Sequence, residues 1–130
     1  MPERLDRTIL AFDFGIKRIG VAVGEPELRT AHPLQALSSF DQVAALIERW
    51  RPTRLVVGRP TSAQGEPHDM TRRAEDFARR LERRFKLPVA RVDERFSSLE
   101  AQSRLRGVKK KPVDSVAAQL LLEQYFDEAA

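Results

Sequence analysis

The sequence predicts an α/β fold built on a single five-stranded mixed sheet, three antiparallel strands plus two parallel ones, flanked by helices. Three short apolar strands follow one another within residues 8–37, and their short connections make them antiparallel neighbours. Further strands then alternate with amphipathic helices, which is typical of parallel strands joined by crossover helices. The length of 130 residues suits one hydrophobic core, so we expect a single domain over residues 1–130.

The first two strands are predicted to form a hairpin with a carboxylate at its turn. The apolar runs 8–14 and 19–23 are separated by a short segment that contains Gly15, Lys17 and Arg18. Asp13 ends the first run among apolar neighbours, where an ionised acid needs exposure or a cationic partner such as a divalent metal. A role as a simple turn residue is the alternative for Asp13.

The next elements are a third strand and a helix. Residues 30–37 form the strand, and Pro33 within it indicates either an edge strand or a strand that starts late. A helix is expected to begin at residues 38–41 and to end before Pro52. Its apolar side chains recur at helical spacing, and they are Val43, Ala44, Leu46, Ile47 and Trp50.

The βα units follow. Residues 54–58 form a short β-branched strand, which leads into a Gly- and Pro-rich loop over residues 58–67. Loops at this edge of an open α/β sheet commonly form sites. Residues 71–85 form an amphipathic helix with six arginines on its polar faces, and His68 before it is expected to cap the helix or lie on the surface.

The last part of the chain carries a fifth strand and two helices. Residues 89–94 form the strand, which ends in two acids. Ser97 and Glu100 match a capping box, which predicts a helix over residues 98–106. A basic linker over residues 107–112 precedes the final helix, predicted over residues 114–126.

The charge distribution favours a polyanionic partner. The formal net charge is +4 and the pI is near 10.0. Between residues 72 and 111 there are fourteen Lys and Arg against six Asp and Glu. The positive charge of this stretch exceeds the net charge of the whole chain, so the remaining residues are net acidic. One side of the protein can therefore lie on phosphates, although solvated arginines on a helix face would give the same pattern.

Composition narrows the cellular setting. The chain contains no cysteine, which excludes disulfides and thiolate metal ligands and is compatible with the reducing cytoplasm. No apolar run approaches the roughly 18 residues of a membrane span, and the charged N-terminal residues do not resemble a secretory signal. We expect a cytoplasmic protein without a membrane partner.

Three carboxylates occupy comparable places at the ends of elements. Asp13 ends the first strand, Glu94 ends the fifth, and Asp114 lies in the first turn of the last helix. If the strand ends converge, the three acids form an oxygen-only site that suits Mg²⁺ or Mn²⁺. Two such ions can stabilise the attacking oxygen and the leaving oxygen when a phosphodiester bond is cleaved. Separately, Asp114 could only complement the helix dipole, and Glu94 could only pair with Arg95.

The chain closely resembles the YqgF (RuvX) family over residues 7–126. The stretches that carry the resemblance are residues 11–15, 18–24, 31–34, 56–60, 93–98 and 113–118. The resemblance implies an RNase H-like fold of the resolvase branch and a nuclease that trims the 5′ end of the precursor of 16S ribosomal RNA. It places the metal acids of the family on Asp13, Glu94 and Asp114, and it favours Glu94 over Asp93 as the acid that points into the site.

Three features depart from the family pattern. Ile16 stands where a small Thr is common, and Arg59 replaces an apolar residue. The linker over residues 107–111 is shorter than the long loop of many relatives. The shorter linker bears on how the substrate is gripped, and it leaves the assignment of the acids unchanged.

The functions that we expect are ordered as follows. The first is a metal-dependent endonuclease that processes pre-16S ribosomal RNA in ribosome biogenesis, with a resolvase of branched DNA close to it because both would use the same acids. The alternative of another class is a non-catalytic nucleic-acid-binding factor with partners in transcription or ribosome assembly. The sequence predicts no oligomeric state. The cations assigned to nucleic-acid contacts are Lys17, Arg18, Arg59, Arg95, Lys109, Lys110 and Lys111.

Overall fold

The computed structural model describes residues 7–60, 68–93 and 113–129, except for the side chains of Val113, Asp114 and Ala129. The elements are β1 (Ile9–Phe14), β2 (Ile19–Glu25), β3 (Thr30–Leu37), η2 (Phe40–Gln42), α1 (Val43–Trp50), β4 (Arg54–Arg59), α2 (Asp69–Phe85), β5 (Val89–Asp93) and α4 (Val113–Ala129). The predicted helix over residues 98–106 and the basic linker after it lie outside the described residues.

The five strands form one mixed sheet in the order β3-β2-β1-β4-β5. The β1–β2 and β2–β3 pairs are antiparallel, and the β1–β4 and β4–β5 pairs are parallel. The predicted sheet of three antiparallel and two parallel strands is therefore confirmed. Pro33 lies in β3, which is an edge strand as the proline indicated.

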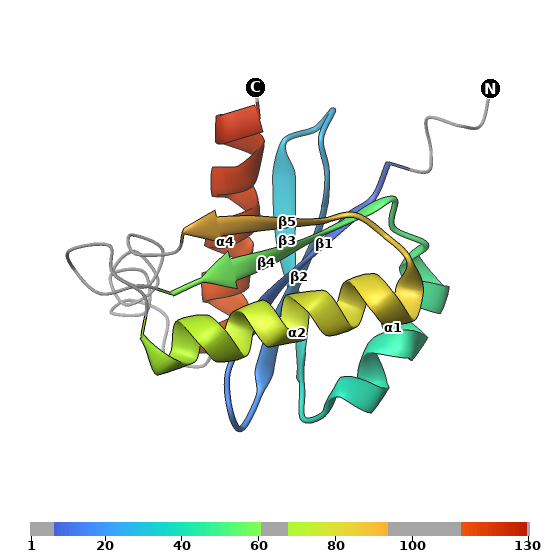
Figure 1. Cartoon of the computed structure of the whole chain (residues 1–130). Helices are drawn as coiled ribbons and strands as arrows, with labels where there is room; N and C mark the ends of the chain where they lie inside the picture. Colours follow the sequence, from blue (N-terminus) through green and yellow to red (C-terminus); the bar gives the residue numbers. More distant parts are fainter. Residues whose placement is uncertain (1–6, 61–67, 94–112, 130) are drawn as a thin grey trace.

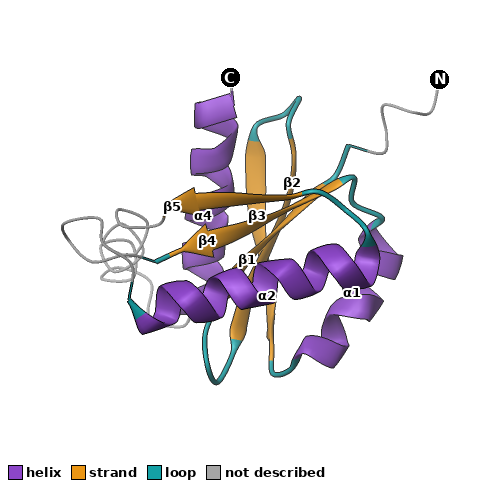
Figure 2. Cartoon of the chain, viewed as in Figure 1, coloured by secondary structure: helices purple, strands orange, loops and turns teal. Residues whose placement is uncertain are grey.

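Helices cover both faces of this twisted sheet (Figure 1). Strand alternation sends Leu10 and Phe12 of β1 to a core cluster that includes Phe77 of α2. Ile9 and Ala11 point to the opposite face and pack in a second cluster. Figure 2 shows α1 and α2 on one side of the sheet and α4 on the other. The two faces thus have separate apolar cores, one under α1 and α2 and one under α4.

The helix ends follow from local residues, with one correction. The segment predicted to open the first long helix is a 3₁₀ turn, η2, and the α-helix begins only at Val43. The Gln42 Oε1 atom accepts from the Ser38 and Ser39 backbone amides at 2.6 and 3.2 Å, which tightens this turn. His68 caps α2 as expected, because its Nδ1 accepts from the Met70 amide at 3.2 Å.

The helix α4 packs closely on β2. A Cβ atom built on Gly24 would lie 2.3 Å from the Thr30 carbonyl oxygen and 3.1 Å from the Leu122 Cδ2 atom. Only glycine allows this approach, because a side chain would push both the neighbouring strand and the helix away. In the described parts of the chain, no helix combines the length and the apolar character needed to cross a bilayer.

Candidate active site

Asp13 lies near the end of β1, on the sheet face that α4 covers. Ile9 and Ala11 precede it with the same strand parity and pack in the cluster under α4, so alternation directs Asp13 to that face. Its partner on β2 is Gly20, which carries no side chain. Asp13 is only half-buried. Strand pairing therefore fixes the direction of the Asp13 side chain. Because Gly20 beside it has no side chain, the carboxylate stays accessible to solvent.

The first turn of α4 lies at the same end of the sheet as Asp13. Ser115 is buried, and its hydroxyl donates to the Leu34 carbonyl oxygen at 2.7 Å. Leu34 pairs with Val21 of β2, and Val21 pairs with Phe12, the residue before Asp13. The backbone of Asp114 is therefore at the level of Asp13 in the sheet. The side chain of Asp114 lies outside what the structure describes.

The end of β5 supplies the third expected carboxylate. Val92 packs in the cluster under α4, whereas Arg91 contacts Glu75 and Glu82 of α2. Asp93 has the parity of Arg91, so it lies on the face opposite to Asp13. The register thus removes Asp93 as a partner of Asp13, and it leaves Glu94 as the candidate that the family resemblance favours. Glu94 lies outside the described residues.

The helix α4 connects these three places. Near its start it is tied to β3 through Ser115, and further along Gln124 Nε2 donates to the Asp93 carbonyl oxygen at 3.1 Å. The helix thus spans the sheet from the β3 edge strand to the end of β5. Within the described residues, no group of three or more acidic or histidine side chains is placed to hold a metal ion. Two of the three expected ligands, Glu94 and Asp114, are not among those side chains.

The described cations of the expected nucleic-acid surface lie beside this end of the sheet. Lys17 and Arg18 are exposed on the β1–β2 turn, whose tight form requires Gly15 because a Cβ there would lie 2.6 Å from the Arg18 carbonyl oxygen. Arg59 is half-buried at the end of β4 and lines a mixed-charge pocket with residues of α2. The remaining expected contacts, Arg95 and Lys109 to Lys111, lie outside the described residues.

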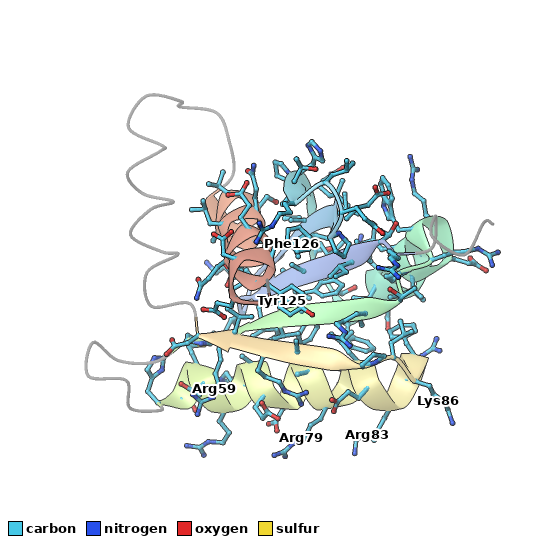
Figure 3. All side chains as sticks on the ribbon, turned by 90° about the horizontal axis from the view of Figure 1, so that it is seen from above. Arg59, Arg79, Arg83, Lys86, Tyr125 and Phe126 are labelled. Carbon is cyan, nitrogen blue, oxygen red and sulfur yellow. The ribbon has the colours of Figure 1, made fainter. Side chains whose placement is uncertain are left out.

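Arg80 is a further cation beside the candidate site, and the sequence alone did not single it out. Its guanidinium carbon lies 4.0 Å from the centroid of the Phe40 ring, and the two residues line a small cavity with Lys17 and Arg18. The sequence places Arg80 on a basic helix, but the stacking on Phe40 of η2 is a tertiary contact. Figure 3 shows Arg79, Arg83 and Lys86 along the outer side of the same helix. We define a band of cations that comprises Lys17, Arg18 and Arg80 at the hairpin turn and the exposed arginines of α2, among which Arg79 is paired with Glu75 and Asp76.

Comparisons with known proteins match nearly the whole chain. A family model described as "RuvX: Holliday junction resolvase" matches residues 7–128. A protein of Dechloromonas aromatica (strain RCB) named "Putative pre-16S rRNA nuclease" is 52% identical over 132 residues, covering 92% of this chain and 90% of that relative. A protein of Nitrosomonas europaea with the same name is 49% identical, covering 92% of this chain and 89% of the relative.

Solved structures show the same fold at low sequence identity. RuvC of Thermus thermophilus, solved with a Holliday junction substrate, superposes with a TM-score of 0.63 at 16% identity. The match covers 94% of this chain and 95% of RuvC. A second structure of the same RuvC gives a TM-score of 0.55. The five-stranded sheet and its helices are thus the RNase H-like fold that the family resemblance implied.

Proposed function

The chain belongs to the RuvX family, and from that membership we propose that it is a metal-dependent nuclease that hydrolyses phosphodiester bonds in the 5′ maturation of precursor 16S ribosomal RNA. The observation that carries the proposal is the place of Asp13, fixed on the α4 face of β1 at the level where Ser115 anchors the first turn of α4. The names of the relatives supply the substrate class. Maturation of this RNA would place the protein in the cytoplasm.

Asp13, Glu94 and Asp114 are proposed to hold the metal ions. The chain has no cysteine, so these acids offer a set of oxygen donors, which is the set that Mg²⁺ and Mn²⁺ prefer. A bound pair of such ions would stabilise the attacking and leaving oxygens of the displacement. Because Asp13 pairs with Gly20 of β2, and the residues of β1 before it are paired on both sides, Asp13 would keep its direction with or without metal.

The cations beside the carboxylates are proposed to position the nucleic acid. Lys17, Arg18 and Arg80 surround the hairpin cavity next to the end of β1, and each can contact a phosphate. The arginines of α2 extend this band away from the carboxylates. Contacts of this kind fix the register of a strand without reading its bases, so the cleavage position would depend on the shape of the RNA.

The test is a cleavage assay with purified protein, a structured RNA that carries a precursor 5′ extension, and EDTA, Mg²⁺ or Mn²⁺. We expect cleavage only with a metal, and loss of cleavage in Asp13→Asn with an unchanged circular dichroism spectrum. The control is Asp41→Asn, since Asp41 is exposed on η2. Full activity of Asp13→Asn would overturn the proposed centre. Tight binding without cleavage in any metal would instead favour a non-catalytic factor.

Cleavage of branched DNA is the second candidate. The matched family model carries the description of a Holliday junction resolvase, and the RuvC structure of the same fold contains such a junction. Both reactions would use the same acids, so the variants above do not separate them. Parallel reactions with a four-way DNA junction, linear duplex DNA and the RNA do. Cleavage of the junction at a higher kcat/KM than the RNA would favour the resolvase.

A further inference from the structure

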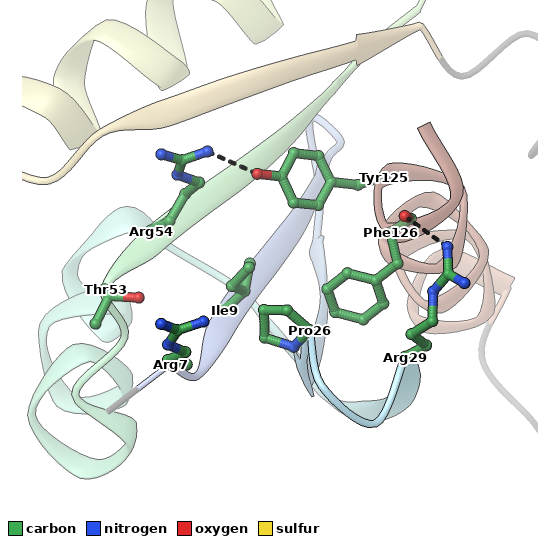
Figure 4. A pocket seen from close by; sticks show the side chains of 8 residues that line it. All are labelled: Arg7, Ile9, Pro26, Arg29, Thr53, Arg54, Tyr125 and Phe126. Atoms are coloured by element: carbon green, nitrogen blue, oxygen red, sulfur yellow. Dashed lines mark hydrogen bonds between the residues drawn. The ribbon is translucent and has the colours of Figure 1, made fainter. Parts of the chain in front are cut away.

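A second concave site lies at the end of the sheet opposite to Asp13. It is a cavity of about 430 Å³, a size that suits small ligands. Its lining comes from four separate parts of the chain, and the residues are Arg7, Ile9, Pro26, Arg29, Thr53, Arg54, Tyr125 and Phe126 (Figure 4). Ile9 begins β1, four residues before Asp13, so the cavity is about 13 Å along the strand from the candidate active site.

The floor of this cavity is apolar. Ile9 and Phe126 are only 4% and 5% exposed, and Pro26 of the β2–β3 turn completes the floor. Figure 4 shows these three side chains between Arg7 and Arg54 on one side and Arg29 on the other. The ring of Tyr125, next to Phe126 on α4, forms part of the wall. The floor thus presents apolar side chains to the cavity.

The rim of the cavity is cationic and partly fixed in place. Arg54 Nη1 donates to the Tyr125 hydroxyl at 2.8 Å, and Arg29 Nη2 donates to the Phe126 carbonyl oxygen at 3.2 Å. Both acceptors are neutral, so these bonds orient the two guanidinium groups without cancelling their charge. Since a fixed side chain loses less entropy on binding, this arrangement favours an anionic ligand.

The carboxylates near the rim compensate these cations only weakly. Glu27 lies 3.5 Å from Arg7 and Asp127 lies 3.9 Å from Arg29, and all four side chains are about half exposed or more. Ion pairs of this kind contribute little in water. Among the described residues that line the cavity there are three arginines and no carboxylate. The lining therefore keeps a net positive charge.

We propose that this cavity binds a nucleotide, with its phosphate held by arginines of the rim and its base on the apolar floor. A phosphate carries up to two charges and several acceptor oxygens, so it suits the guanidinium groups of the rim better than a single carboxylate does. A base has a flat face, which matches Pro26, Phe126 and the Tyr125 ring. The same chemistry is offered by a free nucleotide and by one nucleotide of a nucleic acid chain.

The test is calorimetric titration of the full-length protein in EDTA, so that the readout does not depend on cleavage. The probes are adenosine monophosphate, adenosine and inorganic phosphate. We expect the nucleotide to bind at least about tenfold more tightly than the other two, because only it engages both parts of the cavity. Arg54→Gln and Arg29→Gln should each weaken the nucleotide about tenfold and leave adenosine unchanged.

Two further variants sharpen the result. Tyr125→Phe keeps the ring but frees Arg54, so it should weaken the nucleotide and leave adenosine unchanged. Arg49→Gln is the matched control, since Arg49 is exposed on α1 and does not line the cavity, and it should bind the nucleotide like the wild type. Equal affinity for inorganic phosphate and the nucleotide, unchanged affinity in the Arg54 and Arg29 variants, or no binding at millimolar nucleotide would overturn the proposal.

A fourth probe, a short single-stranded oligonucleotide, distinguishes a free nucleotide from one nucleotide of a nucleic acid chain. If it binds more tightly than the mononucleotide and is weakened by Arg54→Gln, the cavity holds one unit of a nucleic acid chain. If the mononucleotide binds more tightly, the cavity holds a free nucleotide. Both titrations are made in EDTA and are read through Arg54→Gln, which lies outside the proposed nuclease centre, so failure of that centre would be distinguishable from failure of this site.

Discussion

Arg91 of β5 and Glu82 of α2 are joined by a hydrogen-bonded ion pair of 2.6 Å, and the same guanidinium lies 2.8 Å from Glu75 on the same helix. Hydrogen bonds from Arg91 hold the pKa of Glu82 below its ordinary value, and the two carboxylates raise the pKa of Arg91. The pair fixes β5 against α2. Because Glu94 follows this strand directly, the ion pair also bears on the candidate active site.

Replacing Arg91 tests that connection. We expect Arg91→Met to lower the free energy of unfolding by about 1–2 kcal/mol, because it leaves two partly buried carboxylates facing each other. Cleavage should fall further than stability explains, since β5 carries the strand end next to Glu94. Urea unfolding and a cleavage assay at a temperature where the variant is fully folded measure the two effects. Arg91→Lys keeps the positive charge but cannot form the paired hydrogen bonds of the guanidinium group. If its activity equals that of Arg91→Met, the hydrogen-bond geometry matters more for activity than the charge does.

The Glu82–Arg91 pair predicts a pH dependence of stability. The pKa of Glu82 is lower in the folded chain than its ordinary value of 4.5, mainly because of the Arg91 hydrogen bond. The stabilisation is therefore complete above that value, and it is lost as the pH falls through the lower folded pKa. Urea unfolding across this acid range should show a shallower decline for Glu82→Gln than for the wild type. Glu48→Gln, on the exposed face of α1, is the control and should follow the wild type.

Ser115 is expected to matter more for activity than for stability. Ser115→Ala removes the hydrogen bond to the Leu34 carbonyl oxygen and should lower the free energy of unfolding by about 1 kcal/mol. It also loosens the turn that carries Asp114, so kcat should fall. Gln119→Met removes a second tie from α4 to β3, the bond to the Ala31 carbonyl oxygen, about one turn away. This control should lose similar stability with a smaller loss of kcat; equal losses of kcat would contradict the positioning role.

Gly24 is expected to tolerate no side chain. Gly24→Ala would place its Cβ atom 2.3 Å from the Thr30 carbonyl oxygen and against Leu122 of α4, so strand or helix must shift. We expect a loss of about 1–3 kcal/mol in the free energy of unfolding. The control is Leu28→Ala in the neighbouring turn, where the side chain is 64% exposed and the change should be under about 0.5 kcal/mol. Urea unfolding with an equal result for both variants would contradict the close approach.

Binding to nucleic acid is expected to fall steeply with salt. If Lys17 and Arg18 bind phosphates, the double alanine variant should reduce the log–log salt slope by about 0.7 to 0.9 for each phosphate that is no longer neutralised. A triple Lys→Ala change at residues 109–111 tests the basic linker in the same way. Arg49→Ala, on α1, is the control for a cation outside this band. Fluorescence anisotropy at several salt concentrations measures the slope, and an unchanged slope in both multiple variants would place the binding surface elsewhere.

Local sequence patterns predicted the elements well because each depends on a few neighbouring residues. The hairpin that carries Asp13, the edge position indicated by Pro33 and the cap formed by His68 are all short-range effects. The extent of the first long helix was wrong, since Gln42 bonds back to Ser38 and Ser39 and tightens the opening turn. A pattern of apolar residues cannot predict a hydrogen bond between a polar side chain and the backbone.

The contacts that assemble the two sites could not be read from the sequence. Ser115 and Leu34 are 81 residues apart, and the cavity beside Phe126 draws on four segments. Such pairings depend on how the sheet twists and where α4 lies on it. The family resemblance named Asp13, Glu94 and Asp114, but the register that removes Asp93 from the α4 face appears only in the structure. These three acids stay a prediction until the metal assays are made.

The place of α4 at the end of the chain determines when one face of the sheet becomes covered during synthesis. This helix follows all five strands in the chain, yet it covers Ile9 and Ala11 near the beginning. While the ribosome is still translating the earlier residues, one side of the sheet has no cover and offers an apolar surface to chaperones. Closure comes only after residues 113–129 emerge, and those residues include Asp114. A chain interrupted before these residues would therefore leave this face of the sheet uncovered and would lack Asp114, one of the proposed metal ligands.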